Sequence, residues 1–153
     1  LTECSPIVTV KLWLDRRVLP RQFIGLPGRV MHWAFQKGLP FGGQGSYVSM
    51  VSSGADVLTK LSNQKVIDIA VSNLRAAFPE PAWQVTGASV IRERRATFSL
   101  APGQPSRPGT ETNIEELFLA GDWVETGLPS TIESAVVSGH RAAASVYRLL
   151  AAA

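Results

Sequence analysis

A short apolar run that stops at a glycine–aspartate pair constrains the fold of this chain more than any other sequence feature. Leu117 to Ala120 are consecutive apolar residues, a pattern typical of a strand that is buried on both faces in a parallel sheet. The pair Gly121-Asp122 ends the run, and after a loop we expect a helix over about residues 131–150. The segment therefore predicts a strand, a tight turn and a helix, the repeating unit of α/β proteins.

The expected helix carries an apolar stripe and a predicted N-terminal cap. Ser130 and Glu133 have the S-x-x-E spacing of a capping box, so we expect the helix to begin beside them. Gly139 lies within the stripe, where glycine costs roughly 1 kcal/mol relative to alanine, and this predicts a close contact with a strand or a cofactor. The stripe comprises Ile132, Ala135, Val136, Gly139, Ala143, Val146 and Leu150.

This strand–turn–helix segment is a candidate cofactor site. The free N–H groups and the dipole of a helix N-terminus favour an electron-rich or anionic ligand, and ligands of α/β sheets bind where the strands end. Gly121 would let the backbone approach a cofactor closely, and Asp122 could accept hydrogen bonds from sugar-like hydroxyl groups. The pattern alone leaves a strand–loop–helix unit without any ligand as an equal alternative.

Upstream of this segment the sequence predicts an antiparallel sheet with one helix. Alternating apolar and β-branched residues predict extended chain over residues 5–14, 23–26, 30–35, 46–52 and 83–98. A helix is expected from Ser62, its N-cap, to Phe78, with Pro79 and Pro81 preventing its continuation.

The strand patterns also predict which side chains share a face. Val8, Val10, Leu12 and Leu14 are expected to do so, as are Met31, Trp33 and Phe35. Such residues suit a plain sheet core, which we favour, or the wall of a pocket for a long hydrocarbon.

Several other features are weaker candidates for function. Gly42-Gly43-Gln44-Gly45 precedes an alternating strand, which favours a hairpin turn over a phosphate-binding loop. The cluster Arg92, Arg94 and Arg95 would be split between two strand faces, which favours a solvated surface over a phosphate site. A single cysteine excludes an internal disulfide, and His32 and His140 lack ligands at metal-binding spacing, so we expect no metal.

The C-terminal segment resembles a known flavin-binding motif. Leu117–Trp123 (LFLAGDW) and Gly127–Gly139 (GLPSTIESAVVSG) are similar to the C-terminal motif of the FAD-dependent amine oxidase and phytoene desaturase superfamily. Upstream segments look most like its squalene-associated desaturase branch, the hydroxysqualene dehydroxylases of bacterial hopanoid synthesis. These segments are Ser5–Val10, Arg92–Phe98 and Arg107–Gly109.

The resemblance implies a site for part of FAD. It implies that Asp122 holds the ribityl or pyrophosphate region, and that the backbone near Thr131 and Ile132 meets the flavin ring. The G-x-G-x-x-G turn that grips the ADP half of FAD in this superfamily is absent from the sequence. The implied cofactor-binding residues are Gly121, Asp122, Trp123, Pro129, Ser130, Thr131, Ile132 and Glu133; the resemblance assigns no catalytic side chain and no metal.

The resemblance also implies the fold class and domain organisation. We expect an α+β and α/β combination in which residues 1–112 belong to a substrate-binding domain, an antiparallel sheet with a helix over about residues 62–78. Residues 113–153 would supply the last strand and helix of a Rossmann-like FAD-binding domain. Because the chain begins with Leu1 and lacks the glycine-rich turn, we expect it to be part of a longer enzyme and inactive alone.

The implied reaction is hydride transfer involving flavin on an apolar isoprenoid of the hydroxysqualene type. A phytoene or carotenoid desaturase and a flavin amine oxidase are alternatives. A different class of function, a membrane-surface or partner-binding domain, is suggested by the charge distribution: residues 1–100 carry 12 basic and 6 acidic side chains, and residues 101–153 carry 3 and 6. We expect no nucleic-acid partner, and a cytoplasmic location with optional peripheral contact at the inner face of the membrane. The oligomeric state is left open.

Overall fold

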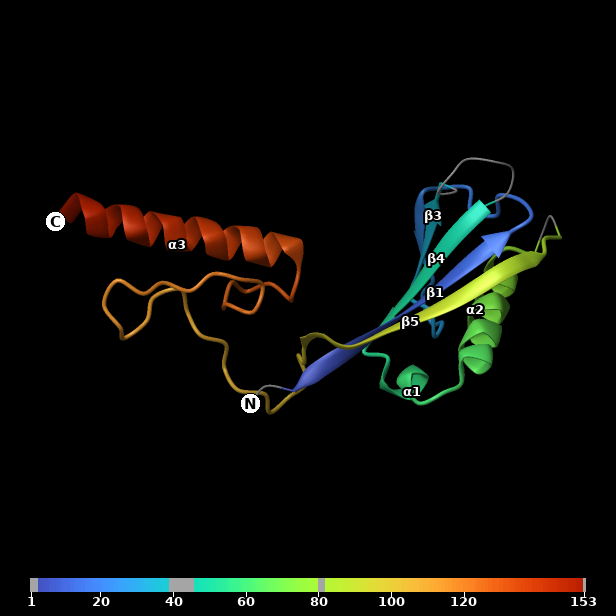
Figure 1. Cartoon of the computed structure of the whole chain (residues 1–153), viewed down its shortest axis with the longest axis horizontal. Coiled ribbons are helices and arrows are strands. Elements are labelled where there is room, and N and C mark those ends of the chain that lie inside the picture. The colour runs from blue at the N-terminus through green and yellow to red at the C-terminus, as the bar shows by residue number, and fades with distance from the viewer. Residues whose placement is uncertain (1–2, 39–45, 80–81, 153) are drawn as a thin grey trace. The chain divides into compact units, whose positions relative to one another are not determined.

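The computed structural model describes residues 3–38, 46–79 and 82–152. They form two compact units. Residues 5–96 make up the first, called here the sheet unit, and the remaining described residues, 3–4 and 97–152, make up the second, the C-terminal unit (Figure 1). The predicted boundary at residue 112 therefore differs from the division into compact units, and the domain assignment itself stays a prediction.

The sheet unit is built on five strands in the order β2-β3-β4-β1-β5. The pairs β2–β3, β3–β4 and β4–β1 are antiparallel. The end of β1 meets the start of β5, where the Asp15 N–H donates to the Gln84 carbonyl over 3.1 Å, so this pair is antiparallel too. The strands are β1 (Cys4–Leu14), β2 (Phe23–Gly25), β3 (Trp33–Lys37), β4 (Ser46–Ser53) and β5 (Val85–Phe98).

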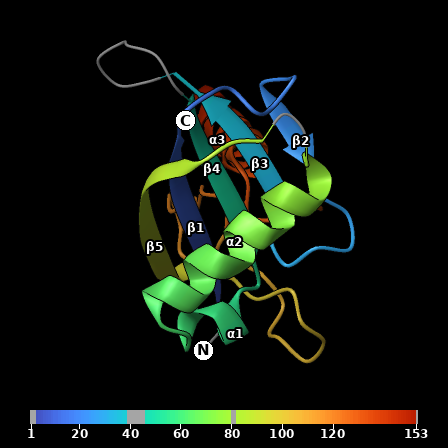
Figure 2. The same ribbon diagram turned by 90° about the vertical axis from the view of Figure 1, so that its right-hand side faces the viewer.

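Helix α2 (Asn63–Ala77) lies across one face of the sheet (Figure 2). Ser62 caps it as predicted, because its side chain accepts a hydrogen bond from the Lys65 N–H. A four-residue helix that the sequence reading missed, α1 (Asp56–Thr59), precedes it. Val66, Ala70 and Leu74 of α2 are fully buried, so the helix covers the sheet through one apolar stripe.

The core of the sheet unit confirms the predicted strand pattern. Val8, Val10, Leu12 and Leu14 point toward α2 and are at most 2% exposed, and Val48 and Met50 of β4 are fully buried among them. This periodicity of two defines the buried face from sequence alone. The preferred interpretation of these residues as sheet core is the one that the structure supports.

The opposite face of the sheet carries a cluster of aromatic side chains, called here the aromatic face: Trp13, Phe23, Trp33, Phe35 and Tyr47. Trp13 stacks on Tyr47 with 5.2 Å between ring centroids, and the other three lie 6.3–6.4 Å from one another. Phe23 is 59% exposed and Trp33 is 45% exposed. Among the described residues of this unit, no helix comparable to α2 covers the aromatic face.

The prediction that Met31 shares a face with Trp33 and Phe35 is wrong. Met31 is fully buried in the core, whereas Trp33 belongs to the aromatic face. The alternation does not extend back to Met31 because β3 begins only at Trp33. Before it, the Met31 N–H donates to the Asn73 side chain of α2 over 3.0 Å instead of joining the sheet.

The C-terminal unit consists of a long irregular segment and helix α3 (Ile132–Ala152). The predicted strand over Leu117–Ala120 is wrong for this structure, since the run makes only an isolated antiparallel bridge between Phe118 and Glu111. A β-strand forms only where a neighbouring strand pairs its backbone N–H and C=O groups. Within the described part of this unit, the neighbouring chain at Thr110 and Glu111 pairs with the segment only at this bridge and through the Leu119 N–H, which donates to the Thr110 carbonyl over 2.8 Å, so the apolar run does not form a strand.

Helix α3 turns its serines inward. The buried residues of the helix are Ser134, Ser138 and Ser145. Its predicted apolar stripe faces outward, with Ile132 86% and Leu150 71% exposed. A side chain built on Gly139 would meet nothing within 4 Å, so the predicted close contact at this glycine is not formed among the described residues.

Candidate functional site

The glycine–aspartate turn has a backbone that only glycine fits. Gly121 has a φ of 151°, a conformation that side chains rarely adopt. A Cβ atom at this position would also lie 2.7 Å from Cδ1 of the Trp123 indole, well inside contact distance. The indole therefore packs directly against the Gly121 backbone, and both features hold the turn in one shape.

Hydroxyl groups of α3 bind this turn. Ser138 Oγ accepts from the Gly121 N–H over 2.9 Å and donates toward the Gly121 carbonyl over 2.8 Å. Ser134 Oγ lies 3.3 Å from the Asp122 carbonyl and 2.7 Å from the Thr126 hydroxyl. Both serines are fully buried. The sequence reading missed them, although serines spaced four residues apart on the polar side of α3 are a signal that could have been read.

The side chain of Asp122 lies beside the start of α3. Its Oδ2 accepts a hydrogen bond from the Ser130 hydroxyl. The residue is only partly buried, so the carboxylate keeps acceptor capacity toward solvent. The structure thus brings together two residues, Asp122 and Ser130, that the sequence reading assigned to one site.

The cap of α3 differs from the prediction by one position. Thr131, rather than Ser130, accepts the capping bond, from the Ser134 N–H over 3.2 Å, and the helix begins at Ile132. The Ser130–Glu133 capping box is therefore wrong, because the Ser130 hydroxyl is already engaged by Asp122. The N–H groups of Ile132 and Glu133 have no hydrogen-bond partner among the described residues, as expected in a first helical turn.

The remaining predicted residues form an open surface around this helix start. Trp123 is 43% exposed and Ile132 is 86% exposed, while Pro129 and Glu133 are exposed as well. All eight predicted residues thus belong to one stretch of the C-terminal unit: at the glycine–aspartate turn, just before α3, or in the first turn of α3. Together they can present a carboxylate, two free N–H groups and apolar side chains to one ligand.

A partly buried arginine, Arg107, shapes the loop between the turn and the helix. Arg107 binds Glu125 through two parallel hydrogen bonds, Nε to Oε2 at 3.0 Å and Nη2 to Oε1 at 2.9 Å. The Gly127 N–H also donates to Glu125 Oε1 over 2.7 Å. This N–H group, followed by the guanidinium of Arg107 and the charge of Arg141, lowers the pKa of Glu125, while burial opposes the shift. Glu125 is therefore held as the carboxylate.

Other sequence candidates lie in the sheet unit and serve the fold. Arg92 donates to the Asn63 side chain and to the Leu61 carbonyl over 2.8 Å, which anchors β5 to the start of α2. The glycine-rich run of residues 42–45 lies outside the described residues. No group of three His, Cys, Asp or Glu side chains within the described ranges is arranged to hold a metal ion. No helix in the described part of the chain is long and apolar enough to cross a membrane.

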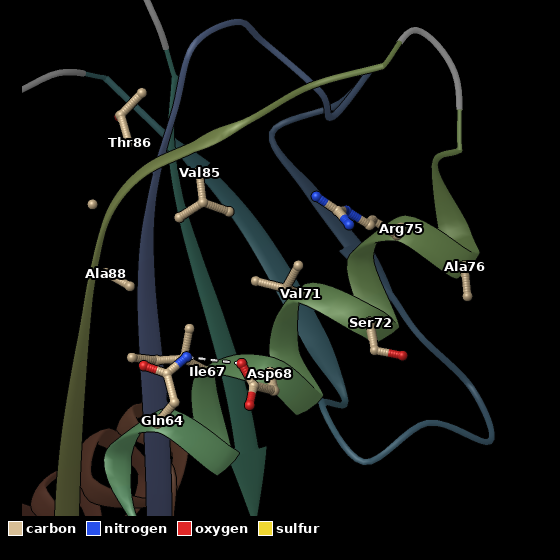
Figure 3. A pocket seen from close by; sticks show the side chains of 11 residues that line it. Gln64, Ile67, Asp68, Val71, Ser72, Arg75, Ala76, Val85, Thr86 and Ala88 are labelled. Atoms are coloured by element: carbon tan, nitrogen blue, oxygen red, sulfur yellow. Dashed lines mark hydrogen bonds between the residues drawn. The ribbon is translucent and has the colours of Figure 1, made fainter.

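A hollow of about 950 Å³ lies elsewhere, between α2 and the start of β5 (Figure 3). Its apolar lining includes Ile67, Val71 and Val85, and the Gln64 amide donates to Asp68 at its rim over 2.8 Å. The guanidinium carbon of Arg75 lies 5.3 Å from the centroid of the Trp83 ring. None of the eight predicted cofactor-binding residues lines it, so its volume is no evidence for or against their role.

The donor set at the start of α3 fits one end of a nucleotide-type cofactor such as FAD. A carboxylate suits hydroxyl donors, free helix N–H groups suit an electron-rich ring edge or a phosphate, and exposed Trp123 and Ile132 suit an aromatic ring. At the turn itself the Trp123 indole occupies the space that a Gly121 side chain would take, so the predicted close approach of a cofactor to this backbone is not open in the structure. The residues present therefore fit part of the cofactor that the sequence motif implies.

Comparison with known proteins agrees with the motif. The model of the family described as flavin containing amine oxidoreductase matches residues 2–147. The chain is 34% identical over 147 residues to a hydroxysqualene dehydroxylase of Sinorhizobium fredii, an alignment that covers 93% of this chain and 32% of that protein.

Two further relatives match shorter stretches. A hydroxysqualene dehydroxylase of Rhodopseudomonas palustris is 55% identical over 64 residues, 41% of this chain and 14% of that protein. A zeta-carotene desaturase of Solanum lycopersicum is 32% identical over 106 residues, 68% of this chain and 18% of that protein. The chain thus spans about a third of the length of the curated relatives it matches, or less.

Proposed function

Because this chain belongs to the family of flavin-containing amine oxidoreductases, we propose that residues Gly121 to Glu133 hold part of an FAD molecule. The observation that carries the proposal is the joining of Asp122 to Ser130 beside the free N–H groups at the start of α3. Asp122 would accept hydrogen bonds from hydroxyls of the ribityl or pyrophosphate region. The backbone of Thr131 and Ile132 would meet the flavin ring, with Trp123, Pro129 and Glu133 around it.

The proposed fold assignment follows from the same segment. Residues 113–153 would be the last strand and helix of a Rossmann-like FAD-binding domain, and residues 1–112 part of a substrate-binding domain. Leu117 to Ala120 would then form a strand when a larger parallel sheet supplies neighbours for it. The outward apolar stripe of α3 supports this, because such a stripe is typical of a helix packed on a sheet.

When bound, FAD supplies the capacity to exchange a hydride with the substrate. The residues of this chain would hold and tune it. The Ile132 and Glu133 N–H groups and the dipole of the 21-residue α3 stabilise negative charge at the helix start. The Ser130 hydroxyl fixes the orientation of the Asp122 carboxylate and leaves its other lone pairs for the cofactor.

The proposed substrate of the whole protein is an apolar isoprenoid of the hydroxysqualene type, in hopanoid biosynthesis. The names of the relatives, hydroxysqualene dehydroxylase and zeta-carotene desaturase, support this class. The aromatic face of the sheet unit supports it independently, since clustered exposed aromatic side chains suit a long hydrocarbon. Carotenoid desaturation and amine oxidation are the alternatives within the family.

The cofactor assignment is tested by titrating the chain with FAD while its backbone amide signals are followed by NMR. We expect shifts at Asp122, Trp123 and residues 130–133, at an affinity weaker than micromolar, because the residues that grip the ADP half are absent from the chain. Asp122→Asn should weaken binding, whereas Asp56→Asn on the sheet unit should not. Shifts absent from residues 121–133 would overturn the assignment, and a tight yellow complex would overturn the expected inactivity of the chain alone.

The substrate class is tested in a chimera. The matched third of the Sinorhizobium fredii relative would be exchanged for this chain, and the product assayed with hydroxysqualene, phytoene and a simple amine. We expect turnover of hydroxysqualene alone. Turnover of phytoene or of the amine instead would select one of the alternatives.

A second candidate function is binding to an anionic membrane surface, with the protein in the cytoplasm at the inner face of the membrane. Its specific support is the aromatic face, where Lys37 Nζ lies 5.5 Å above the Phe35 ring, together with the excess of basic residues before residue 100. Sedimentation with phosphatidylserine vesicles tests it. Salt-sensitive co-sedimentation that Trp33→Ser abolishes would favour this function; the absence of co-sedimentation would remove it.

A further inference from the structure

Arg107 lies 14 residues before the glycine–aspartate turn, yet it organises the loop that follows that turn. We propose that Arg107 is a positioning residue for the flavin: it locks residues 124–128 in one conformation and so sets where Asp122 and Ser130 stand. The inference rests on the proposed function, because it assigns a role toward the cofactor. Arg107 acts through its contacts with this loop, which connects to Asp122 and Ser130. The proposed role does not require Arg107 to touch FAD.

Each nitrogen of the Arg107 guanidinium is used on this loop. Nε and Nη2 hold the Glu125 carboxylate, and Nη1 donates to the Val124 carbonyl over 3.3 Å and to the Leu128 carbonyl over 2.8 Å. The guanidinium also stacks 5.0 Å from the Phe98 ring. The Arg107 side chain is 15% exposed, which reduces competition from water.

These bonds fix both ends of the loop at once. Val124 is fully buried directly after the turn, and Leu128 lies two residues before Ser130. The backbone of Glu125 is held as well, since its N–H donates to the Pro108 carbonyl over 2.8 Å. A change in the loop conformation would therefore displace Ser130, and with it the Asp122 carboxylate that the Ser130 hydroxyl orients.

The geometry requires arginine rather than any cation. A planar guanidinium can donate hydrogen bonds to one carboxylate and two carbonyl groups that lie in different directions. A lysine ammonium has only three donors on one nitrogen and cannot reach all of these groups. Arg148 is the natural contrast, because it binds Glu111 near the far end of α3 and both side chains are 68% exposed. A charge change at Arg148 should leave the loop unaffected.

The test uses the full chain in four forms: wild type, Arg107→Gln, Arg107→Lys and, as the matched control, Arg148→Gln. Hydrogen exchange measured by NMR reports the Gly127, Leu128 and Ser134 amides, and an FAD titration reports shifts at Asp122 and at residues 130–133. We expect Arg107→Gln to speed exchange of the three amides about tenfold or more and to weaken FAD binding about tenfold. Arg107→Lys should fail to restore either property, and Arg148→Gln should match the wild type.

The outcomes separate this inference from the proposed function. FAD shifts of equal size and affinity in wild type and Arg107→Gln overturn the role of Arg107 and leave the cofactor assignment standing. No FAD shifts in the wild type overturn the assignment and, with it, the flavin role of Arg107. Unchanged exchange at Gly127, Leu128 and Ser134 in Arg107→Gln overturns the claim that the arginine locks the loop. Amides of β1, such as that of Val10, should keep their wild-type exchange in every variant; their loss of protection would indicate general unfolding and contradict a local role.

Discussion

At Gly121 a single missing side chain determines the shape of the candidate site. An alanine at this position would have to adopt a φ of 151°, and its methyl group would collide with the Trp123 indole. We predict that Gly121→Ala lowers the free energy of unfolding of the C-terminal unit by about 1–3 kcal/mol, the usual range for a strained backbone position. Urea unfolding followed by hydrogen exchange of α3 peptides, which belong to this unit alone, measures it.

The matched control is Gly109→Ala in the same unit. A Cβ at Gly109 would meet nothing within 4 Å, so this change should be nearly neutral. Equal effects of the two substitutions would contradict the steric argument at Gly121.

Glu125 predicts how the loop responds to acid. Its pKa is lowered by the Gly127 N–H and then by Arg107 and Arg141, so the stabilisation that it gives is complete above its ordinary value of 4.5. That stabilisation is lost as the pH falls through the lower pKa of the folded state. We predict a titration of the Gly127 amide signal below pH 4.5, measured by NMR, that disappears in Glu125→Gln. Glu115→Gln removes the same charge from the same unit and should leave the titration of the Gly127 signal unchanged. A Gly127 signal that still titrates in Glu125→Gln would refute the assignment.

At the scale of elements, α3 is attached through its hydroxyl groups. Ser138 satisfies both the N–H and the carbonyl of Gly121, and it is fully buried. We predict that Ser138→Ala costs about 1–3 kcal/mol of stability in the C-terminal unit, since it leaves the Gly121 N–H without its partner, whereas the Gly121 carbonyl still accepts from the Val124 N–H over 3.2 Å. Urea unfolding monitored by hydrogen exchange of α3 peptides would measure the loss.

Ser72→Ala on α2 provides the comparison for Ser138. Ser72 is an exposed helical serine, and alanine has the higher helix propensity, so this change should be neutral or slightly stabilising. If Ser138→Ala were equally harmless, the hydroxyls would not be what holds α3 to the turn.

The elements also show what the sequence could and could not predict. The strands β1 and β4 and the start of α2 were predicted well because alternation and a capping serine are local properties. The Leu117–Ala120 strand was not formed because pairing depends on a neighbour that an apolar pattern does not specify.

The candidate site, too, could be predicted from the sequence only in part. Its eight residues could be named from the motif, but the one-residue shift of the α3 cap follows from Asp122 taking the Ser130 hydroxyl, a contact across eight residues. In the sequence, Arg107 carries no signal beyond the resemblance of residues Arg107–Gly109 to the family. Its role became visible once four hydrogen bonds converged on it from a loop about 20 residues away.

At the scale of the whole molecule, the two units differ in how they are stabilised. The continuous hydrophobic core lies entirely within residues 8–90, in the sheet unit. In the C-terminal unit, Val124 is the buried apolar residue among those that the structure describes, and its other buried side chains are serines. Since buried apolar area dominates stability, the C-terminal unit should open at a much lower free energy than the sheet unit.

We therefore predict two separate unfolding transitions, distinguished by two substitutions of the same kind. Val124→Ala should unfold the C-terminal unit under conditions where the sheet unit stays native, because it truncates the one buried apolar side chain among the described residues of that unit. Val10→Ala should leave the first transition in place and lower the second by about 2–3 kcal/mol, as expected for truncation in a packed core.

Hydrogen exchange measured by mass spectrometry resolves the two units during urea unfolding, with peptides of β1 and β4 reporting the sheet unit and peptides of α3 reporting the other. A single transition that both substitutions shift equally would contradict the division. Two transitions would mean that the candidate FAD segment is marginally stable by itself, in which case a cofactor or a protein surface covering the apolar stripe of α3 would raise the first transition and leave the second unchanged.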